Sequence, residues 1–322
     1  MSRYLVTGAT GYIGSMLVKN LINENITVIV RNKLKAAKML PQNIHIIEAD
    51  LTDSDSLEKV DCEYDYIIHC ASITKSSEMI NNPLEVTQSI VNATQNVMDL
   101  TVRCHAKSVI YISSMEIYGD IDCTDGHLVE EHELGQVDLL SARSCYPLAK
   151  RMAENICYCY YLEHHLPIKI VRLAQVFGKG VLENETRVFA QFAKCVIEKR
   201  DIVLHTLGKS YGNYCESEDA INAILLILEK GKNGEAYNVA NEDCTMMISQ
   251  MAQFVAGEIA HNQITVKWEV PSENVYGYAA DTGLRLSSQK LRSLGWKPQK
   301  GMLEMYEDLI NDERKWIKKS KC

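Results

Sequence analysis

Residues 4–14 read YLVTGATGYIG and hold an apolar run, three glycines spaced three apart and the start of an amphipathic segment. The run Tyr4–Thr7 predicts a strand, and the residues after the glycines predict a helix. Glycine permits a tight turn between the two and lets the backbone come close to a ligand. The helix start offers free N–H groups and the positive end of its dipole to a phosphate. The stretch therefore predicts a dinucleotide site whose pyrophosphate lies on Gly8, Gly11 and Gly14.

The first 174 residues continue this alternation of apolar runs and amphipathic segments. Further apolar runs occur at Thr27 to Val30, Ile44 to Ile47, Tyr66 to His69, Ser108 to Ser113 and Ile168 to Leu173. Helical patterns such as Val86 to Val102 lie between them. Strands that alternate with helices and read as continuous apolar runs indicate a parallel sheet covered on both faces. We therefore predict an α/β fold, with a Rossmann-type doubly wound parallel sheet over residues 1–174.

The alternation changes after residue 174. The later segments are a polar stretch at 182–186, helical patterns at 188–198 and 220–229, the second ending near Gly231, and a strand pattern at 237–239. We predict that residues 175–322 form a smaller C-terminal α/β lobe that binds the substrate. Parts of 211–245 are expected to pack back on the first sheet. A cleft between two lobes is the usual place for a small-molecule site.

Composition excludes several classes of protein. The chain has 322 residues and a net charge of −8, with no basic block, which argues against nucleic-acid binding. It has no uncharged apolar stretch of about 18 residues, so no membrane helix is predicted. The N-terminus runs directly into a strand rather than a secretory signal, which predicts a cytoplasmic protein. The 11 cysteines are scattered without the spacing of a metal site, so we expect no metal.

The residues after the second predicted strand bear on which nicotinamide cofactor binds. An acid at this place holds the ribose 2′-hydroxyl, whereas an arginine accommodates a 2′-phosphate. This chain has Arg31, Asn32 and Lys33 there and no acid, which favours NADP. The same cations also fit the solvated start of a helix, so both NADP and NAD stay open. Asp50 and Leu51 follow the third strand, where Asp50 could accept from the adenine amino group or cap a helix.

Further motifs follow the glycine loop in a fixed order. They are Asp50-Leu51, His69-Cys70-Ala71-Ser72, Ser113-Ser114-Met115-Glu116-Ile117-Tyr118-Gly119 and Tyr146-Pro147-Leu148-Ala149-Lys150. With these motifs the chain resembles the extended short-chain dehydrogenase/reductases, the NAD-dependent epimerase/dehydratase family of nucleotide-sugar 4-epimerases, 4,6-dehydratases and UDP-glucuronate decarboxylases. The resemblance covers most of the chain. It implies a nucleotide-diphosphate sugar as the substrate and a homodimer as the assembly.

The resemblance also implies a catalytic set. Tyr146 and Lys150 are four residues apart, so they share one face of a helix. A phenol has an ordinary pKa near 10, and a nearby ammonium favours its ionised form. Tyr146 can then take the proton from a sugar hydroxyl while hydride leaves the same carbon for the cofactor. Ser114 would hydrogen-bond that hydroxyl, and Lys150 would also bind the cofactor ribose.

The expected cofactor-binding residues extend beyond the glycines. They are Gly8, Thr10, Gly11, Tyr12, Ile13, Gly14, Arg31, Asn32, Asp50, Leu51, Cys70, Ala71, Ser72, Tyr146, Lys150 and Leu173. The expected substrate-binding residues are Thr74, Ser114, Gln175, Arg187 and Lys209, with Lys194 as a further candidate for the diphosphate.

Glu116 is the fourth predicted catalytic residue. Oxidation at C4 of a sugar makes the C5 proton acidic, and an acid two residues after Ser114 resembles GDP-mannose 4,6-dehydratases and UDP-glucuronate decarboxylases. There it serves as a base or an electrostatic partner near C5. The alternative is a turn residue that faces solvent. Met115 stands where dTDP-glucose dehydratases carry an aspartic acid, and methionine cannot donate the proton that expels water.

Other positions both support and weaken the decarboxylase reading. The run Arg143-Ser144-Cys145-Tyr146 and the run from Arg187 to Phe192 resemble decarboxylases. Gly212, however, stands where the family has an arginine that meets the diphosphate or the substrate carboxylate. Gln175 and Ile90 each replace a usual asparagine. These departures leave the substrate open.

The sequence therefore predicts an enzyme that oxidises a nucleotide-activated sugar, at C4, by hydride transfer to NAD(P) and then epimerises or dehydrates it. Surface-polysaccharide biosynthesis is the expected setting. One alternative is a cofactor-binding sensor or complex subunit without turnover, since a fold does not fix a function. Another is a reductase of a free small carbonyl, which needs the same catalytic residues but no diphosphate pocket.

Overall fold

The computed structural model describes residues 1–123, 126–183, 185–272 and 281–320. A seven-stranded sheet forms its larger part, in the order β10-β6-β5-β4-β1-β2-β3, and every pair of neighbours is parallel. The strands are β1 (Arg3–Thr7), β2 (Asn25–Val30), β3 (His45–Glu48), β4 (Tyr66–His69), β5 (Ser108–Ser114), β6 (Ile168–Leu173) and β10 (Ala236–Val239). The predicted doubly wound parallel sheet is confirmed.

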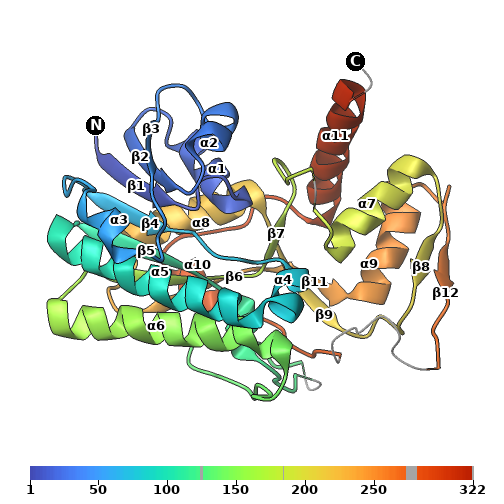
Figure 1. The fold of residues 1–322 in the computed structure, drawn as a ribbon. Helices are drawn as coiled ribbons and strands as arrows, with labels where there is room; N and C mark the ends of the chain where they lie inside the picture. The colour runs from blue at the N-terminus through green and yellow to red at the C-terminus, as the bar shows by residue number, and fades with distance from the viewer. Residues whose placement is uncertain (124–125, 184, 273–280, 321–322) are drawn as a thin grey trace.

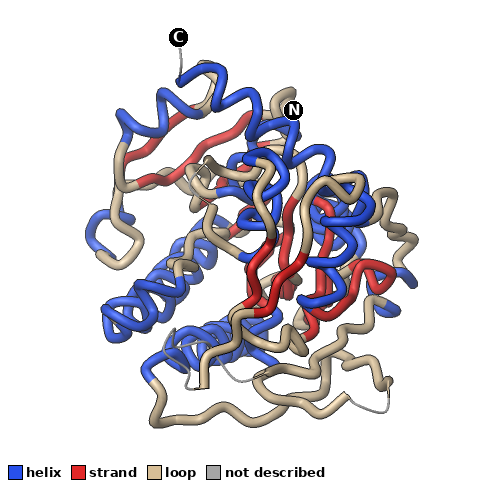
Figure 2. Tube along the Cα trace, turned by 90° about the vertical axis from the view of Figure 1, so that its right-hand side faces the viewer, coloured by secondary structure: helices blue, strands red, loops and turns tan. Residues whose placement is uncertain are grey.

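Two layers of helices cover this sheet (Figures 1 and 2). One face packs against α1 (Tyr12–Asn20), α2 (Lys33–Met39), α8 (Ser217–Lys230) and α10 (Gln289–Ser293). The other face packs against α3 (Ser54–Glu58), α5 (Pro83–Cys104) and α6 (Cys145–His164), with α4 (Ser76–Asn81) beside α5. Successive side chains of a strand point to opposite faces of the sheet, so Val6 of β1 packs in the first core and its neighbour Leu5 in the second. Both faces of the sheet are therefore apolar and are covered by helices.

The second lobe combines short strands with helices of different lengths. Its strands are β7 (Gln175–Phe177), β9 (Tyr211–Glu216) and β11 (Asn241–Met247) in one sheet, and β8 (Ile202–Leu204) with β12 (Val266–Trp268) in another. Its helices are α7 (Val188–Glu198), α9 (Ile248–Phe254), the π-helix η3 (Val255–Ile259) and α11 (Met302–Ser320). Phe177, Phe189 and Tyr306 are fully buried at its centre. In Figure 1, α11 stands beside α7.

The chain crosses between the lobes more than once. After β9 it returns to the large sheet, where α8 packs and β10 pairs with β6, and it then re-enters the lobe at β11. Two 3₁₀ turns lie near the ends of strands or helices of the large sheet: η1 (Met115–Tyr118) follows β5, and η2 (Ala142–Ser144) precedes α6. None of the described helices is long and apolar enough to span a membrane.

Candidate active site

The glycine loop joins β1 to α1 in a conformation that side chains would block. Gly8 has φ +70°, and a Cβ there would lie 2.7 Å from the backbone nitrogen of Ala71. A Cβ on Gly14 would lie 2.3 Å from the carbonyl oxygen of Gly8. Gly11 caps α1, and no side chain satisfies the N–H groups of the first turn. The loop therefore presents free donors to an anion, as a bound pyrophosphate requires.

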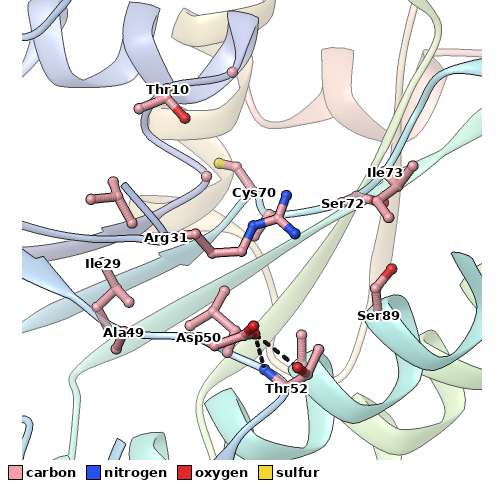
Figure 3. A pocket seen from close by; sticks show the side chains of 16 residues that line it. Thr10, Ile29, Arg31, Ala49, Asp50, Thr52, Cys70, Ser72, Ile73 and Ser89 are labelled. Atoms are coloured by element: carbon pink, nitrogen blue, oxygen red, sulfur yellow. Dashed lines mark hydrogen bonds between the residues drawn. The ribbon is translucent and has the colours of Figure 1, made fainter. Parts of the chain in front are cut away.

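A pocket opens beside this loop, at the carboxyl ends of β1, β2, β3 and β4 (Figure 3). Its lining is Gly8, Thr10, Gly11, Ile29, Val30, Arg31, Ala49, Asp50, Leu51, Thr52, Cys70, Ala71, Ser72, Ile73, Ser89 and Ala93. Ser72 Oγ is buried and has no hydrogen-bond partner among the described residues, so a ligand hydroxyl or phosphate can satisfy it. These donors and this shape fit a nicotinamide dinucleotide.

Seven predicted cofactor residues lie outside this lining, namely Tyr12, Ile13, Gly14, Asn32, Tyr146, Lys150 and Leu173. The Tyr12 ring packs against the hydrophobic core, and its hydroxyl donates to the Lys179 carbonyl at 3.0 Å. Ile13 packs on the core behind the loop, and Leu173 is buried at the end of β6. Asn32 caps α2, because its Oδ1 accepts from the Lys35 N–H at 2.8 Å.

Asp50 holds a turn as well as lining the pocket. Its Oδ1 accepts from the backbone N–H of Thr52 at 2.9 Å and from the Thr52 hydroxyl at 2.8 Å. The backbone hydrogen bond from Thr52 is the main cause that lowers the pKa of Asp50, and the Arg31 guanidinium adds a smaller contribution. Helix α3 is capped by Asp53 instead.

A buried chain of hydrogen bonds, missed in the sequence, supports the pocket floor. The Ala71 N–H donates to Thr7 Oγ1 at 3.3 Å, Thr7 Oγ1 lies 2.7 Å from His69 Nδ1, and His69 Nε2 lies 3.5 Å from Thr94 Oγ1. Thr94 donates its proton to the Ile90 carbonyl at 2.7 Å. We therefore assign the proton of His69 to Nε2, with Nδ1 accepting from Thr7. Burial lowers the pKa of His69 to about 3, so the ring is neutral.

Ser114, Tyr146 and Lys150 converge where β5 ends. Lys150 is buried, and its Nζ donates to the Ile112 carbonyl at 2.8 Å and lies 5.9 Å from the Tyr146 ring centroid. Burial lowers the pKa of Lys150 to about 8. Burial also raises the pKa of Tyr146, while its hydrogen bond with Ser114 opposes that shift. Cys70, a pocket residue, follows β4, which pairs with β5, so the end of β5 where the three side chains converge is next to the pocket.

Glu116 is paired rather than free. One nitrogen of Arg143, Nη2, donates to both of its carboxylate oxygens, at 2.8 and 2.7 Å. The pair is about one-third exposed and lies beside Tyr146, where Glu116 raises the pKa of the phenol and Arg143 lowers it. Arg143 comes from η2, three residues before Tyr146. The sequence motif contained this arginine, but its spacing gave no sign of the contact with Glu116.

The predicted substrate-binding residues are distributed over several elements. Gln175 begins β7, opposite Tyr214 in the register, and is half-buried. Arg187 donates to Glu185 Oε2 at 2.6 Å, and its charge also reaches Tyr146. Lys194 Nζ lies 3.5 Å from the Glu185 carbonyl. Thr74 and Lys209 are exposed and make no hydrogen bond or ion pair among the described residues.

The space beside Gly212 is occupied by the side chain of Tyr214, from the same strand. A Cβ at Gly212 would lie 2.2 Å from the hydroxyl oxygen of Tyr214, which is fully buried. An arginine could not take this place without displacing the ring. A different cation lies close by, since Arg285 stacks over the Tyr211 ring at 5.3 Å. Its Nε is buried and unpaired among the described residues, and sequence analysis did not select it.

Comparison with known proteins agrees with this geometry. Residues 4–240 match the model of the NAD dependent epimerase/dehydratase family. The chain belongs to this family. It is 24% identical to a UDP-N-acetyl-alpha-D-glucosaminuronate decarboxylase of Bacillus cytotoxicus, over 96% of this chain and 99% of the relative.

Solved structures of the family share the fold. A UDP-glucose 4-epimerase of Thermotoga maritima, solved with UDP-glucose, superposes with a TM-score of 0.84 at 21% identity, covering 98% of this chain and 99% of that one. RMD of Pseudomonas aeruginosa, solved with NADPH, gives 0.78 at 20% identity, covering 98% and 100%. The predictions of an extended short-chain dehydrogenase/reductase and of an enzyme that uses NAD or NADP are confirmed.

Proposed function

We propose that this enzyme oxidises C4 of the sugar in a nucleotide-diphosphate sugar by hydride transfer to NAD(P), and that epimerisation or elimination follows. The observation that carries the proposal is the placement of Lys150, whose Nζ lies 5.9 Å from the Tyr146 ring centroid and donates to the Ile112 carbonyl of β5, the strand that ends at Ser114. The decarboxylase and 4-epimerase relatives named above support a nucleotide sugar as the substrate. Surface-polysaccharide biosynthesis is the proposed setting.

Tyr146 is the proposed base that takes the proton from the C4 hydroxyl. Ser114 hydrogen-bonds the phenol, and Arg143 and Arg187 also favour its ionised form. The nicotinamide ring, when bound, accepts the hydride from the same carbon. The hydrogen bond to the Ile112 carbonyl holds Lys150 with its Nζ 5.9 Å from the Tyr146 ring centroid. From this position the ammonium can stabilise the phenolate and bind a ribose hydroxyl.

Glu116 is the proposed group at C5. After oxidation of C4 the C5–H bond becomes acidic, and a carboxylate held by Arg143 can accept that proton while the electron pair moves onto the C4 carbonyl. Met115 has no proton to give a leaving hydroxyl, and Gly212 brings no cation to a substrate carboxylate. Both residues favour epimerisation over decarboxylation or a dTDP-glucose type of dehydration.

The remaining roles are proposed from the lobe and the surface. Arg187, Arg285 and Lys209 are the candidate cations for the diphosphate, and Gln175 and Thr74 are the candidate residues for the sugar.

We propose a homodimer through α5 and α6, which pack together and expose Leu84, Met152, Tyr158 and Leu162. The ten cysteines of the described segments are free thiols, which supports a reducing, cytoplasmic location.

The test is a panel of UDP-, CDP-, dTDP- and GDP-sugars with the purified enzyme, followed by NMR of the products. An epimerised or dehydrated sugar is the expected result, and Tyr146→Phe should abolish it. If the protein binds NAD(P) but converts no sugar of the panel, the sensor alternative is supported. If only free carbonyl compounds are reduced, the reductase alternative is supported.

A further inference from the structure

Arg151 joins the helix of the proposed base to the turn that carries the proposed C5 group. It follows Lys150 on α6 and is half-buried. Its Nε donates to the Ile117 carbonyl at 2.6 Å, and its Nη2 donates to the carbonyls of Tyr118 at 3.2 Å and Gly135 at 2.8 Å. One guanidinium therefore bonds the last two residues of η1 and the segment that returns beside them.

The two η1 carbonyls lie where the helical turn ends and supplies no further donors. Gly119, the next residue, has φ +68° and turns the chain away from the axis of η1. No backbone N–H of the described residues bonds the Ile117 carbonyl, whereas the Tyr118 carbonyl also accepts from the Gly135 N–H at 2.8 Å. Arg151 therefore caps η1, and its loss would leave the Ile117 carbonyl without that donor.

Arg151 donates to carbonyls rather than to a carboxylate. Glu154, on the same helix, acts electrostatically on Arg151, but both of its oxygens accept from Arg172, at 2.7 to 3.2 Å. Among the described residues, no carboxylate lies within ion-pair distance of Arg151. The planar, fixed donors of a guanidinium suit such a bridge between neighbouring carbonyls. The contacts of Arg151 are thus those of a backbone restraint.

This restraint acts between two parts of the candidate active site. Helix α6 carries Tyr146 and Lys150, whereas η1 carries Glu116. Arg143 bonds the Glu116 carboxylate from the partly exposed side, and Arg151 bonds the backbone that follows Glu116. Hydride transfer at C4 needs the residues of α6 and the end of β5, which Arg151 does not contact. The step at C5 also needs Glu116 at the correct distance from Tyr146.

We propose that Arg151 is a positioning residue, which fixes η1 against α6 so that Glu116 reaches C5 of a sugar whose C4 hydroxyl lies at Tyr146. The proposal rests on the proposed function, in which Glu116 takes the C5 proton. A displacement of about 1 Å can cost a catalysed step about 100-fold in rate. The step at C5 should therefore depend on Arg151 far more than hydride transfer at C4.

The test compares two rates of the full-length enzyme with the active sugar of the panel. Nicotinamide absorbance in a single turnover measures hydride transfer, and NMR measures deuterium incorporation at C5 from D₂O. Arg151→Met should lower the C5 rate about 10- to 100-fold, but hydride transfer by less than about threefold. Arg151→Lys, which keeps a donor for one carbonyl, should recover part of the C5 rate.

Arg103→Met is the matched control. Arg103 donates to the carbonyls of Glu58 at 3.3 Å and Leu57 at 2.8 Å, so it caps α3 as Arg151 caps η1. Its loss should affect stability in a similar way but leave the ratio of the two rates unchanged. An equal fall of both rates in Arg151→Met, or an unchanged C5 rate, would overturn the proposal. Hydride transfer by the wild type without any C5 exchange would also overturn it.

Hydrogen–deuterium exchange of the protein without sugar gives an arm that needs no turnover. Amides of residues 115–121 and 134–137 should exchange faster in Arg151→Met than in the wild type, and Arg103→Met should not change them. Unchanged exchange in Arg151→Met would contradict the restraint on η1. Faster exchange in a protein that converts no sugar would support the restraint while the proposed function fails.

Discussion

The large-sheet side and the second lobe of this enzyme are built on different principles. On the large-sheet side, the candidate cofactor-binding residues follow the ends of neighbouring parallel strands, so one sheet brings Gly8, Arg31, Asp50 and Cys70 to a single edge. In the lobe, the candidates sit on three-residue strands, helix starts and loops from segments far apart in the chain. The ends of parallel strands meet at one edge of a sheet, so the sheet determines where the side chains that follow them lie. In the second lobe, the position of each candidate side chain depends on its own packing contacts.

The largest expected effect tests the sheet side. Tyr146→Phe should lower kcat by about 10³-fold, the size of a lost general base, and leave cofactor affinity and Tm nearly unchanged. Steady-state kinetics with the active sugar from the panel gives the measurement. Tyr158→Phe, an exposed tyrosine of the same helix, serves as the control and should keep full activity. Comparable activity in Tyr146→Phe would remove the phenol from the mechanism.

His69→Leu tests whether the sheet side depends on its buried polar support. The substitution leaves Thr7 Oγ1 without its 2.7 Å partner in a buried site, so we expect a loss of about 1–3 kcal/mol in unfolding free energy. Cofactor affinity should also fall, since Thr7 holds the Ala71 N–H. Urea denaturation and titration give the two values. His45→Gln, on exposed β3, should change neither.

The lowered pKa of His69 also predicts that stability falls as the pH decreases. Its folded pKa of about 3 lies below the ordinary value of 6.5, so between these pH values the unfolded chain binds more protons. The contribution to stability is complete above pH 6.5 and falls with decreasing pH, by up to about 1.4 kcal/mol per unit. Urea curves at pH 7 and 5 should show this slope in the wild type. An equal slope in His69→Leu would contradict the assignment.

Gly212→Ala tests the lobe. The new Cβ would meet the rigid Tyr214 ring, so we expect a loss of about 1–3 kcal/mol in stability. In a Tyr214→Leu background the same change should cost less, because the clashing ring is gone. Thermal denaturation of the four proteins completes the cycle. An equal cost in both backgrounds would mean that Tyr214 does not set the shape of this part of the lobe.

The smallest effect concerns the pair beside the phenol. Arg143→Gln removes a cation that lowers the pKa of Tyr146, whereas Ser114, Glu116 and Arg187 still face the phenol. The rising limb of the kcat/KM–pH profile should therefore move to higher pH, with a loss of about tenfold at pH 7. Arg143→Lys should restore part of the shift. An unchanged profile would give Arg143 a purely structural role.

These differences explain what the sequence could predict. The glycine loop, the strand ends and the spacing of Tyr146 and Lys150 are local patterns, so the sheet and the arrangement around it were predictable. The pairing of Arg143 with Glu116, 27 residues apart in the chain, and the packing of the Tyr214 ring against Gly212 depend on the folded structure. No spacing along the chain encodes either contact.

The hydrogen bond from Tyr12 to Lys179 has a consequence for how cofactor affinity and sugar affinity depend on each other. Helix α1, which begins at the proposed pyrophosphate site, is bonded through the Tyr12 hydroxyl to a segment whose next residue, Gly180, donates its N–H to Asp312 of α11 in the second lobe. The proposed dinucleotide site and the second lobe are therefore connected by hydrogen bonds. We expect a coupling free energy between them, and by thermodynamic reciprocity bound cofactor should change sugar affinity by the same factor as bound sugar changes cofactor affinity.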